Sequence, residues 1–189
     1  MRITIMILAL AMLSLCVVAA SANRTSANGS IALSRGENAA GTARGKPQPQ
    51  TLCAKNERII FSCPVKRPAK IVSVCASKDL TSETGYMQYR FGLPGKIELE
   101  YPKDRKGTQA KFQYTHYFRA RVDLTEINFT IEGYEYQVFD TYQGEEKPAV
   151  SQQGVSVTAP GKPKEVSFVC RTKPIADYSD LQAVFPNSQ

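Results

Sequence analysis

His116 is the single histidine of the chain, so any Ser-His-Asp or Cys-His catalyst would have to use it. It lies in the segment 113–118, Gln-Tyr-Thr-His-Tyr-Phe, whose aromatic composition is typical of a β-strand. Nucleophilic catalysis needs an activated serine or cysteine, and the chain has no Gly-x-Ser-x-Gly elbow. The sequence therefore favours a strand histidine among aromatic neighbours over a catalytic one.

Two pairs of carboxylates have spacings that suggest glycoside cleavage, Glu98 with Glu100 and Glu132 with Glu135. Glu98 and Glu100 alternate with Leu99, and this pattern is typical of the solvated face of a half-buried strand. Nothing near either pair indicates how the pKa of one carboxyl group would be raised for general acid catalysis. The sequence therefore favours a binding module over an enzyme.

Four of the five cysteines, Cys53, Cys63, Cys75 and Cys170, follow the N-terminal apolar stretch. No Cys-x-x-Cys spacing is present, and a single histidine is too few for the common zinc patterns. Structural disulfides are the expected use of such cysteines in an exported protein. We predict two disulfides, no metal site and no cofactor.

Strand geometry ranks the possible disulfide pairings. If residues 57–63 and 70–77 form a hairpin, Cys63 and Cys75 lie at opposite ends of it, roughly 15 Å apart. A disulfide needs Cα atoms within about 7 Å, which disfavours that pair. We predict Cys53–Cys75 with Cys63–Cys170, and Cys53–Cys63 with Cys75–Cys170 stays open as the alternative.

Residues 1–22 have the features of a secretory signal peptide. Arg2 supplies the positive charge, residues 3–18 are almost wholly apolar, and Ala20-Ser21-Ala22 forms a small-residue cleavage site. Cys16 would be removed with this peptide. A retained membrane anchor is the alternative, since the stretch is barely long enough to span a bilayer. We expect a periplasmic or secreted protein with no integral membrane segment after cleavage.

Residues 23–50 are rich in small and polar residues and end in Lys-Pro-Gln-Pro-Gln. Such a segment buries too little apolar surface to offset its chain entropy, so we interpret it as a disordered basic arm. The whole chain carries a formal charge of +7, and this arm holds much of it. The charge spread and the predicted export argue against nucleic acid as a partner. Residues 51–189 are predicted to form a single domain.

Short apolar runs with period two, separated by turn residues, follow residue 51. About eight strands at this spacing predict an all-β fold, an antiparallel β-sandwich or small barrel. Residues 111–122 and 127–142 are expected to form long strands, with Gly133 bending or bulging the second. The expected core is Ile59, Phe61, Val72, Val74, Met87, Tyr89, Phe91, Ile97, Leu99, Phe129, Ile131, Val166 and Phe168.

Two strands carry aromatic and charged residues on both faces, which is a composition typical of contact surfaces. The alternative is that one row is core and the other is ordinary strand surface. The candidate binding residues are Tyr86, Gln88, Arg90, Tyr114, His116, Tyr117 and Arg119.

The segments Phe61-Ser62-Cys63, 72–77 and 85–92 resemble a group of small exported bacterial proteins with no assigned activity. The resemblance covers roughly residues 53–102, and it implies a bacterial envelope or secreted origin but no mechanism. The disulfide-linked β design is also similar in architecture to periplasmic lysozyme inhibitors. That family's inhibitory loop residues have no match in this chain, and architecture alone does not fix function.

Three functional hypotheses follow. The first is a non-enzymatic exported β domain that binds a protein or an envelope glycan through the seven candidate residues. The second is a hydrolase acting on envelope polymers, which requires a cleft that brings His116 close to two carboxylates. The third is a structural subunit of an envelope assembly, suggested by the basic arm at 23–50.

Overall fold

The computed structural model describes residues 50–186. The predicted signal peptide and the predicted arm, apart from Gln50, lie outside the described residues. The elements are β1 (Arg58–Pro64), β2 (Ile71–Ala76), β3 (Met87–Leu93), β4 (Lys96–Tyr101), the short 3₁₀ helix η1 (Thr108–Lys111), β5 (Gln113–Arg119), β6 (Val122–Ile131), β7 (Tyr134–Gln143), β8 (Val150–Thr158), β9 (Glu165–Val169), β10 (Ile175–Ala176) and α1 (Leu181–Val184).

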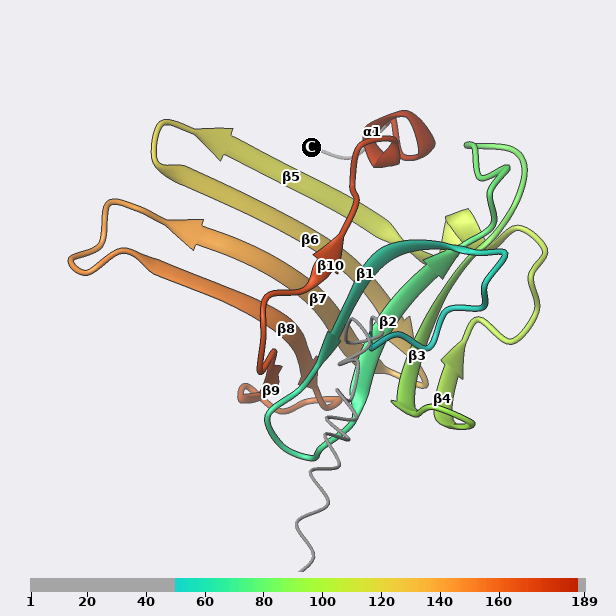
Figure 1. The fold of residues 1–189 in the computed structure, drawn as a ribbon, viewed down its shortest axis with the longest axis horizontal. Helices are drawn as coiled ribbons and strands as arrows, with labels where there is room; N and C mark the ends of the chain where they lie inside the picture. The colour runs from blue at the N-terminus through green and yellow to red at the C-terminus, as the bar shows by residue number, and fades with distance from the viewer. Residues whose placement is uncertain (1–49, 187–189) are drawn as a thin grey trace, which may run out of the picture. The chain divides into compact units, whose positions relative to one another are not determined.

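These strands form two antiparallel sheets, drawn in Figure 1. The N-terminal sheet has the order β10-β1-β2-β3-β4, and the C-terminal sheet has the order β5-β6-β7-β8-β9. Nearly every sheet neighbour is also a chain neighbour, because each turn folds a strand back onto the one before it. The prediction of an all-β antiparallel sandwich is confirmed.

The hydrophobic core lies between the two sheets and draws on alternate residues of both. Two irregularities change which residues face it. A bulge between Ile59 and Phe61 inserts an extra residue into β1, so the buried isoleucine is Ile60 and the prediction for Ile59 is wrong. Ile97 and Val166 are also outside the core, being 44% and 56% exposed on outer strands.

Two tight turns divide the region that the sequence predicts as two long strands. Residues 120–121 join β5 to β6, and Glu132 and Gly133 join β6 to β7. Glu132 and Gly133 both have positive φ, 51° and 81°, which matches the twist of a two-residue hairpin. Gly133 therefore forms a turn between two strands and does not bend one strand.

Both predicted disulfides are present. Cys53 pairs with Cys75, with a Cα–Cα distance of 5.3 Å, and Cys63 pairs with Cys170 at 5.7 Å. The first joins the segment before β1 to β2. The second joins β1 to the residue after β9, and it therefore links the two sheets.

The last described segment, residues 175–186, packs against the face of the C-terminal sheet that points toward the core. β10 pairs with β1 through Ala176 and Ile175, and α1 then places Leu181, Val184 and Phe185 in the core. Residues 181–184 are helical, and their apolar residues recur at a helical spacing of three to four.

Candidate functional site

The seven candidate contact residues do not form one surface. Gln88 and Arg90 are 1% and 3% exposed, and Tyr86 is half-buried. Residues 50–57, which we call the N-terminal strap, pass over the outer face of β2 and β3 and cover them. Because the strap occupies this face, Gln88 and Arg90 cannot belong to an exposed row, and that part of the prediction is wrong.

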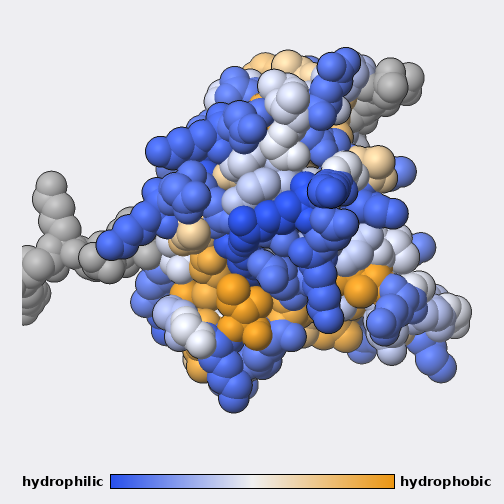
Figure 2. All heavy atoms as spheres, turned by 90° about the vertical axis from the view of Figure 1, so that its right-hand side faces the viewer, coloured by the Kyte–Doolittle hydropathy of each residue, from blue (hydrophilic) through white to orange (hydrophobic). Residues whose placement is uncertain are grey.

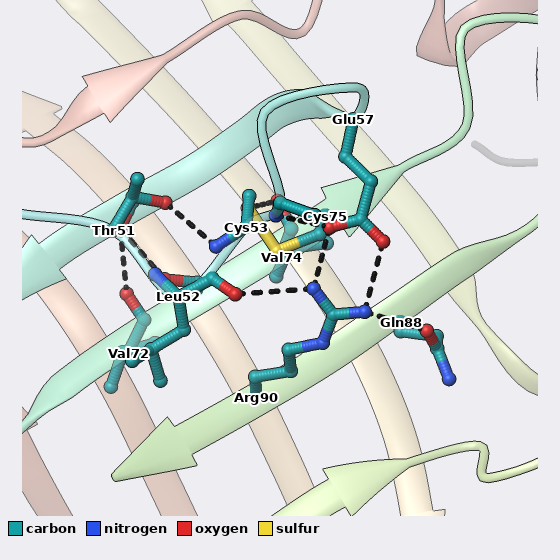
Figure 3. The surroundings of a disulfide bond; sticks show 12 residues. Thr51, Leu52, Cys53, Glu57, Val72, Val74, Cys75, Gln88 and Arg90 are labelled. Atoms are coloured by element: carbon teal, nitrogen blue, oxygen red, sulfur yellow. Dashed lines mark hydrogen bonds and ion pairs between the residues drawn. A yellow bond between two sulfur atoms is a disulfide. The ribbon is translucent and has the colours of Figure 1, made fainter. Parts of the chain in front are cut away.

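Arg90 instead forms a buried ion pair with Glu57 of the strap (Figure 3). The guanidinium donates from Nη1 to Glu57 Oε2 at 2.6 Å and from Nη2 to Glu57 Oε1 at 2.9 Å. It also donates to the Leu52 carbonyl at 3.1 Å, and from Nε to Glu100 at 2.8 Å. The side chains of Arg90 and Glu57 are 4% and 1% exposed, so the pair compensates two buried charges. Glu100 on one side and Arg105 on the other, at 2.8 and 3.7 Å, extend it into a network.

The strap carries further hydrogen bonds to the sheet. The Leu52 amide donates to Ser73 Oγ at 3.0 Å, and Ser62 Oγ donates to the Gln50 carbonyl at 3.0 Å. Among the described residues, no buried side-chain nitrogen or oxygen lacks a hydrogen-bond partner. The network and the Cys53–Cys75 disulfide hold this face closed, which gives it a structural role.

The pKa of Glu57 reflects this pairing. Burial alone would raise the pKa of Glu57. Hydrogen bonds from Arg90, the Ala54 amide and Tyr86 lower the pKa by more than burial raises it, so the pKa of Glu57 lies below the ordinary value of 4.5. A carboxyl group with a lowered pKa contributes stability that is complete above its unfolded-state pKa. That contribution is lost as the pH falls through the folded-state pKa.

We therefore expect the free energy of unfolding to decrease as the pH falls below 4.5, and to decrease less steeply in Glu57→Gln. Urea unfolding of the wild type and of Glu57→Gln, at several pH values from neutral to acid, measures the difference between their free energies of unfolding. The contributions of the other carboxyl groups cancel in this difference. Parallel pH profiles for the two proteins would show that Glu57 carries no such stability.

The other candidates lie on β5, where they point to opposite faces. Tyr114 and His116 share the face that continues the core, and Tyr117 and Arg119 share the outer face. Tyr114 is 3% exposed and is core, so it is not part of an exposed contact row. Tyr117 is 49% exposed, and Arg119 forms a bidentate ion pair with Glu145 of the β7–β8 turn.

Strands β5 to β8 extend past the edge of the N-terminal sheet, at the left of Figure 1. Their inner face is therefore not covered by that sheet in this part of the molecule. A row of rings leads outward along β5 from buried Tyr114 through His116 to Phe118, which is 71% exposed. Adjacent rings in this row have centroids 6.5 Å apart.

A groove of about 530 Å³ lies on this uncovered face, between the strands and the C-terminal segment. We call it the β5–β7 groove. Its lining combines rings, carboxylates, hydroxyls and an amide: Tyr114, His116, Asp123, Thr125, Asp140, Tyr142, Ala176, Tyr178, Ser179 and Gln182.

Two hydrogen bonds order the carboxylates of the groove. His116 Nε2 lies 3.0 Å from Asp123 Oδ1, across the β5–β6 hairpin. The Tyr178 hydroxyl donates to Asp140 Oδ2 at 3.2 Å and thereby holds the C-terminal segment against β7. Burial first, and then the charge of Asp140, raise the pKa of Tyr178, so its hydroxyl stays a donor.

The structure gives the two glutamate pairs of the sequence different settings. Glu100 accepts a hydrogen bond from Arg90, and Glu98 forms an ion pair with Lys70. Glu132 lies in the β6–β7 turn and Glu135 in β7, and Glu132 has positive φ. Glu98 and Glu100 therefore have structural partners.

The described residues contain one cluster with metal-ligand types, Cys53, Glu57 and Cys75. Both cysteines are bonded to each other as a disulfide, so they offer no thiolate to a metal ion. Glu57 is already paired with Arg90. The cluster therefore belongs to the strap and has no ligand role.

The sequence pointed to Tyr114 and His116 but not to the other residues of the groove. Asp123 is placed beside His116 only by the two-residue turn at 120–121, and Asp140 and Tyr142 by the register of β6 with β7. Tyr178 and Gln182 come from the C-terminal segment, and no local pattern links them to β5. The one sequence signal for these residues was the spacing of Asp140 and Tyr142, which are two residues apart and therefore lie on the same face of a strand.

No helix among residues 50–186 has the length and apolar character needed to cross a bilayer. Comparisons with protein-family models, with curated proteins and with solved structures found no match to this chain. The resemblances to small exported bacterial proteins and to periplasmic lysozyme inhibitors therefore stay expectations from the sequence.

Proposed function

We propose that the protein is a non-enzymatic exported β domain that binds a cell-envelope glycan in the β5–β7 groove. The observation that carries the proposal is the lining of that groove, where the rings of His116, Tyr142 and Tyr178 lie beside the carboxylates of Asp123 and Asp140. Two disulfides fit a protein that works in an oxidising compartment.

The chemistry of a saccharide matches this lining. Sugar hydroxyls are donors, and carboxylates are acceptor-only groups that bind them through strong charge-assisted hydrogen bonds. The apolar C–H face of a sugar ring packs against exposed aromatic rings such as Tyr142, which is 44% exposed. The volume of about 530 Å³ lies within the range of small-molecule sites.

The groove also has a fixed geometry, which favours binding over loose contact. Asp140 is held by Tyr178, and Asp123 by His116, so neither carboxylate must be ordered when a ligand arrives. Arg58 of β1 bonds Asp180 at 2.9 Å and fixes the C-terminal segment that forms one wall. Preorganised groups lose less entropy on binding and so contribute more affinity.

We expect Tyr142→Ala to weaken glycan binding about tenfold, which corresponds to about 1.4 kcal/mol. The matched control is Tyr117→Ala, because Tyr117 is 49% exposed and lies on the opposite face of the same sheet. A glycan array identifies the binding saccharide, and isothermal titration calorimetry then compares the wild type with both variants.

The proposal fails if no envelope glycan binds, or if the two tyrosine variants lose affinity equally. Binding of a protein from the envelope, with no glycan recognised on the array, would replace the glycan by a protein partner. Asp123→Asn serves as a second variant, since it keeps the shape of the side chain but removes the charge that accepts sugar hydroxyls.

A hydrolase acting on envelope polymers is the second candidate, and one observation favours it. The groove brings His116 together with two carboxylates, Asp123 and Asp140. Within the described part of the chain, however, His116 is hydrogen-bonded only to Asp123 and to no serine, threonine or cysteine that it would activate. Release of soluble sugars from an envelope polymer, abolished by His116→Ala, would establish this candidate in place of the first.

A further inference from the structure

A second groove lies at the opposite end of β7 from the β5–β7 groove, and its chemistry is different. It has a volume of about 680 Å³ and opens between the edges of the two sheets. We call it the inter-sheet groove. Its walls are Tyr89, Phe91 and Leu99 from β3 and β4, Tyr134 and Tyr136 from β7, Val157 from β8, Val166 and Phe168 from β9, and Ala159, Lys162, Pro163 and Lys164 from the β8–β9 turn.

The floor of this groove belongs to the core. Tyr89 is 2% exposed and packs on Phe129 with ring centroids 4.9 Å apart, and Phe91 packs on Phe168 at 5.9 Å. The rim is unusually apolar, with Val166 56% exposed and Tyr134 44% exposed. The face that carries the β3–β4 hairpin shows apolar residues gathered in its lower part, below a hydrophilic band (Figure 2).

Lys162 and Lys164 are the charged residues among the described lining, which contains no carboxylate. Both lysines are exposed, and neither forms an ion pair within the described range. An apolar groove with two unpaired positive charges at its mouth is complementary to a molecule with an apolar body and one negative end.

We propose that the inter-sheet groove binds a free fatty acid, with its acyl chain between the sheets and its carboxylate at Lys162 and Lys164. The wall offers few polar atoms apart from tyrosine hydroxyls. A peptide in the groove would bury backbone N–H and C=O groups that only the edge strands β4 and β9 could pair, whereas an acyl chain carries no polar group along its length. The charge complementarity at the mouth then fixes which end stays outside.

A second copy of the chain is a poorer occupant of the same groove. A two-fold contact uses the same patch on both subunits, so the lysine pair of one subunit would face the lysine pair of the other. Like charges brought together in this way oppose association. The fatty acid brings the opposite charge and needs no matching surface.

The test is isothermal titration of the purified full chain with decanoate, below the concentration at which decanoate aggregates. We expect decanoate to bind, and Val166→Glu to weaken that binding at least tenfold because it places a carboxylate in the apolar wall. The matched control is Val150→Glu on β8, since Val150 is also an exposed valine, at 38%, and lies outside the groove.

Charge reversal of both lysines, Lys162→Glu with Lys164→Glu, provides a second variant on exposed positions. We expect it to weaken decanoate about tenfold and to leave binding of decanol unchanged, because decanol has no charge. No decanoate binding, equal loss in the Val150 and Val166 variants, binding only to anionic phospholipid vesicles, or a dimer that forms through this face would each overturn the proposal. Glycan binding measured on the same variants stays independent, because the β5–β7 groove shares none of these residues.

Discussion

Arg90→Met is expected to lower the free energy of unfolding by about 3–5 kcal/mol, because it removes the buried cation that is hydrogen-bonded to the Glu57 carboxylate. Glu57 is 1% exposed and accepts two hydrogen bonds from the Arg90 guanidinium, whereas its other cation, Arg105, lies 3.7 Å away and is 54% exposed. Leu52 and Glu100 lose donors in the same substitution. Urea denaturation at neutral pH with both disulfides intact measures the change.

The control for this prediction is Arg119→Met, which breaks an ion pair that lies at the surface. Arg119 and Glu145 are 45% and 50% exposed, so solvent compensates each charge after the other is lost, and little change is expected. The double variant Arg90→Met with Glu57→Leu should recover much of the stability, since it buries no unpaired charge. Equal stability of the Arg90 and Arg119 variants would contradict a buried charge pair in the strap.

Removal of the Cys63–Cys170 disulfide is expected to lower the free energy of unfolding by about 4–5 kcal/mol, because this disulfide closes a loop with a sequence separation of 107. The cross-link reduces the conformational entropy of the unfolded chain, and this effect grows with loop length. The substitutions Cys63→Ala and Cys170→Ala are made together, and thermal or urea unfolding compares the variant with the wild type.

The Cys53–Cys75 disulfide provides the comparison, since its sequence separation is 22 and its expected contribution is about 3 kcal/mol. Removal of Cys53–Cys75 also releases the strap. Hydrogen exchange measured on β2 and β3 distinguishes this local release from global unfolding. A loss below about 1 kcal/mol on removal of Cys63–Cys170 would contradict a structural role for that bond.

The disulfide pairing could be predicted from the sequence because it depends on local geometry. A hairpin of β1 and β2 puts Cys63 and Cys75 at opposite ends. In the strand register, Cys75 lies opposite Ile59 and Cys63 lies opposite Val72, and a bulge at Ile60 changes the register by one residue between them. The same bulge explains why the alternation pattern selected Ile59 for the core when Ile60 is buried.

The positions of the tight turns were harder to predict. The sequence signal for a two-residue hairpin is Asn-Gly or Asp-Gly, and the chain uses Glu132-Gly133 and residues 120–121. The sequence therefore predicted two long strands where the structure has three, β5, β6 and β7. The prediction of His116 on a strand was correct, but its partner Asp123 could not be assigned without the turn between them.

The covered and uncovered faces could not be predicted at all. The period-two pattern shows that Gln88 and Arg90 share a face, but it does not show that a strap lies over that face. The β5–β7 groove likewise depends on strand length, since β6, β7 and β8 have 10, 10 and 9 residues, whereas β1 to β4 have 6 or 7. Long-range arrangement of this kind needs the whole fold, because no single segment encodes it.

A nuclear magnetic resonance titration with the saccharide identified on the array tests the central claim most directly. We predict that the signals of His116, Tyr142 and Gln182 shift with increasing saccharide, and that those of Tyr117 and the strap do not. Shifts centred on the outer face of the C-terminal sheet, or no shifts at saturating saccharide, would contradict a glycan site in the β5–β7 groove.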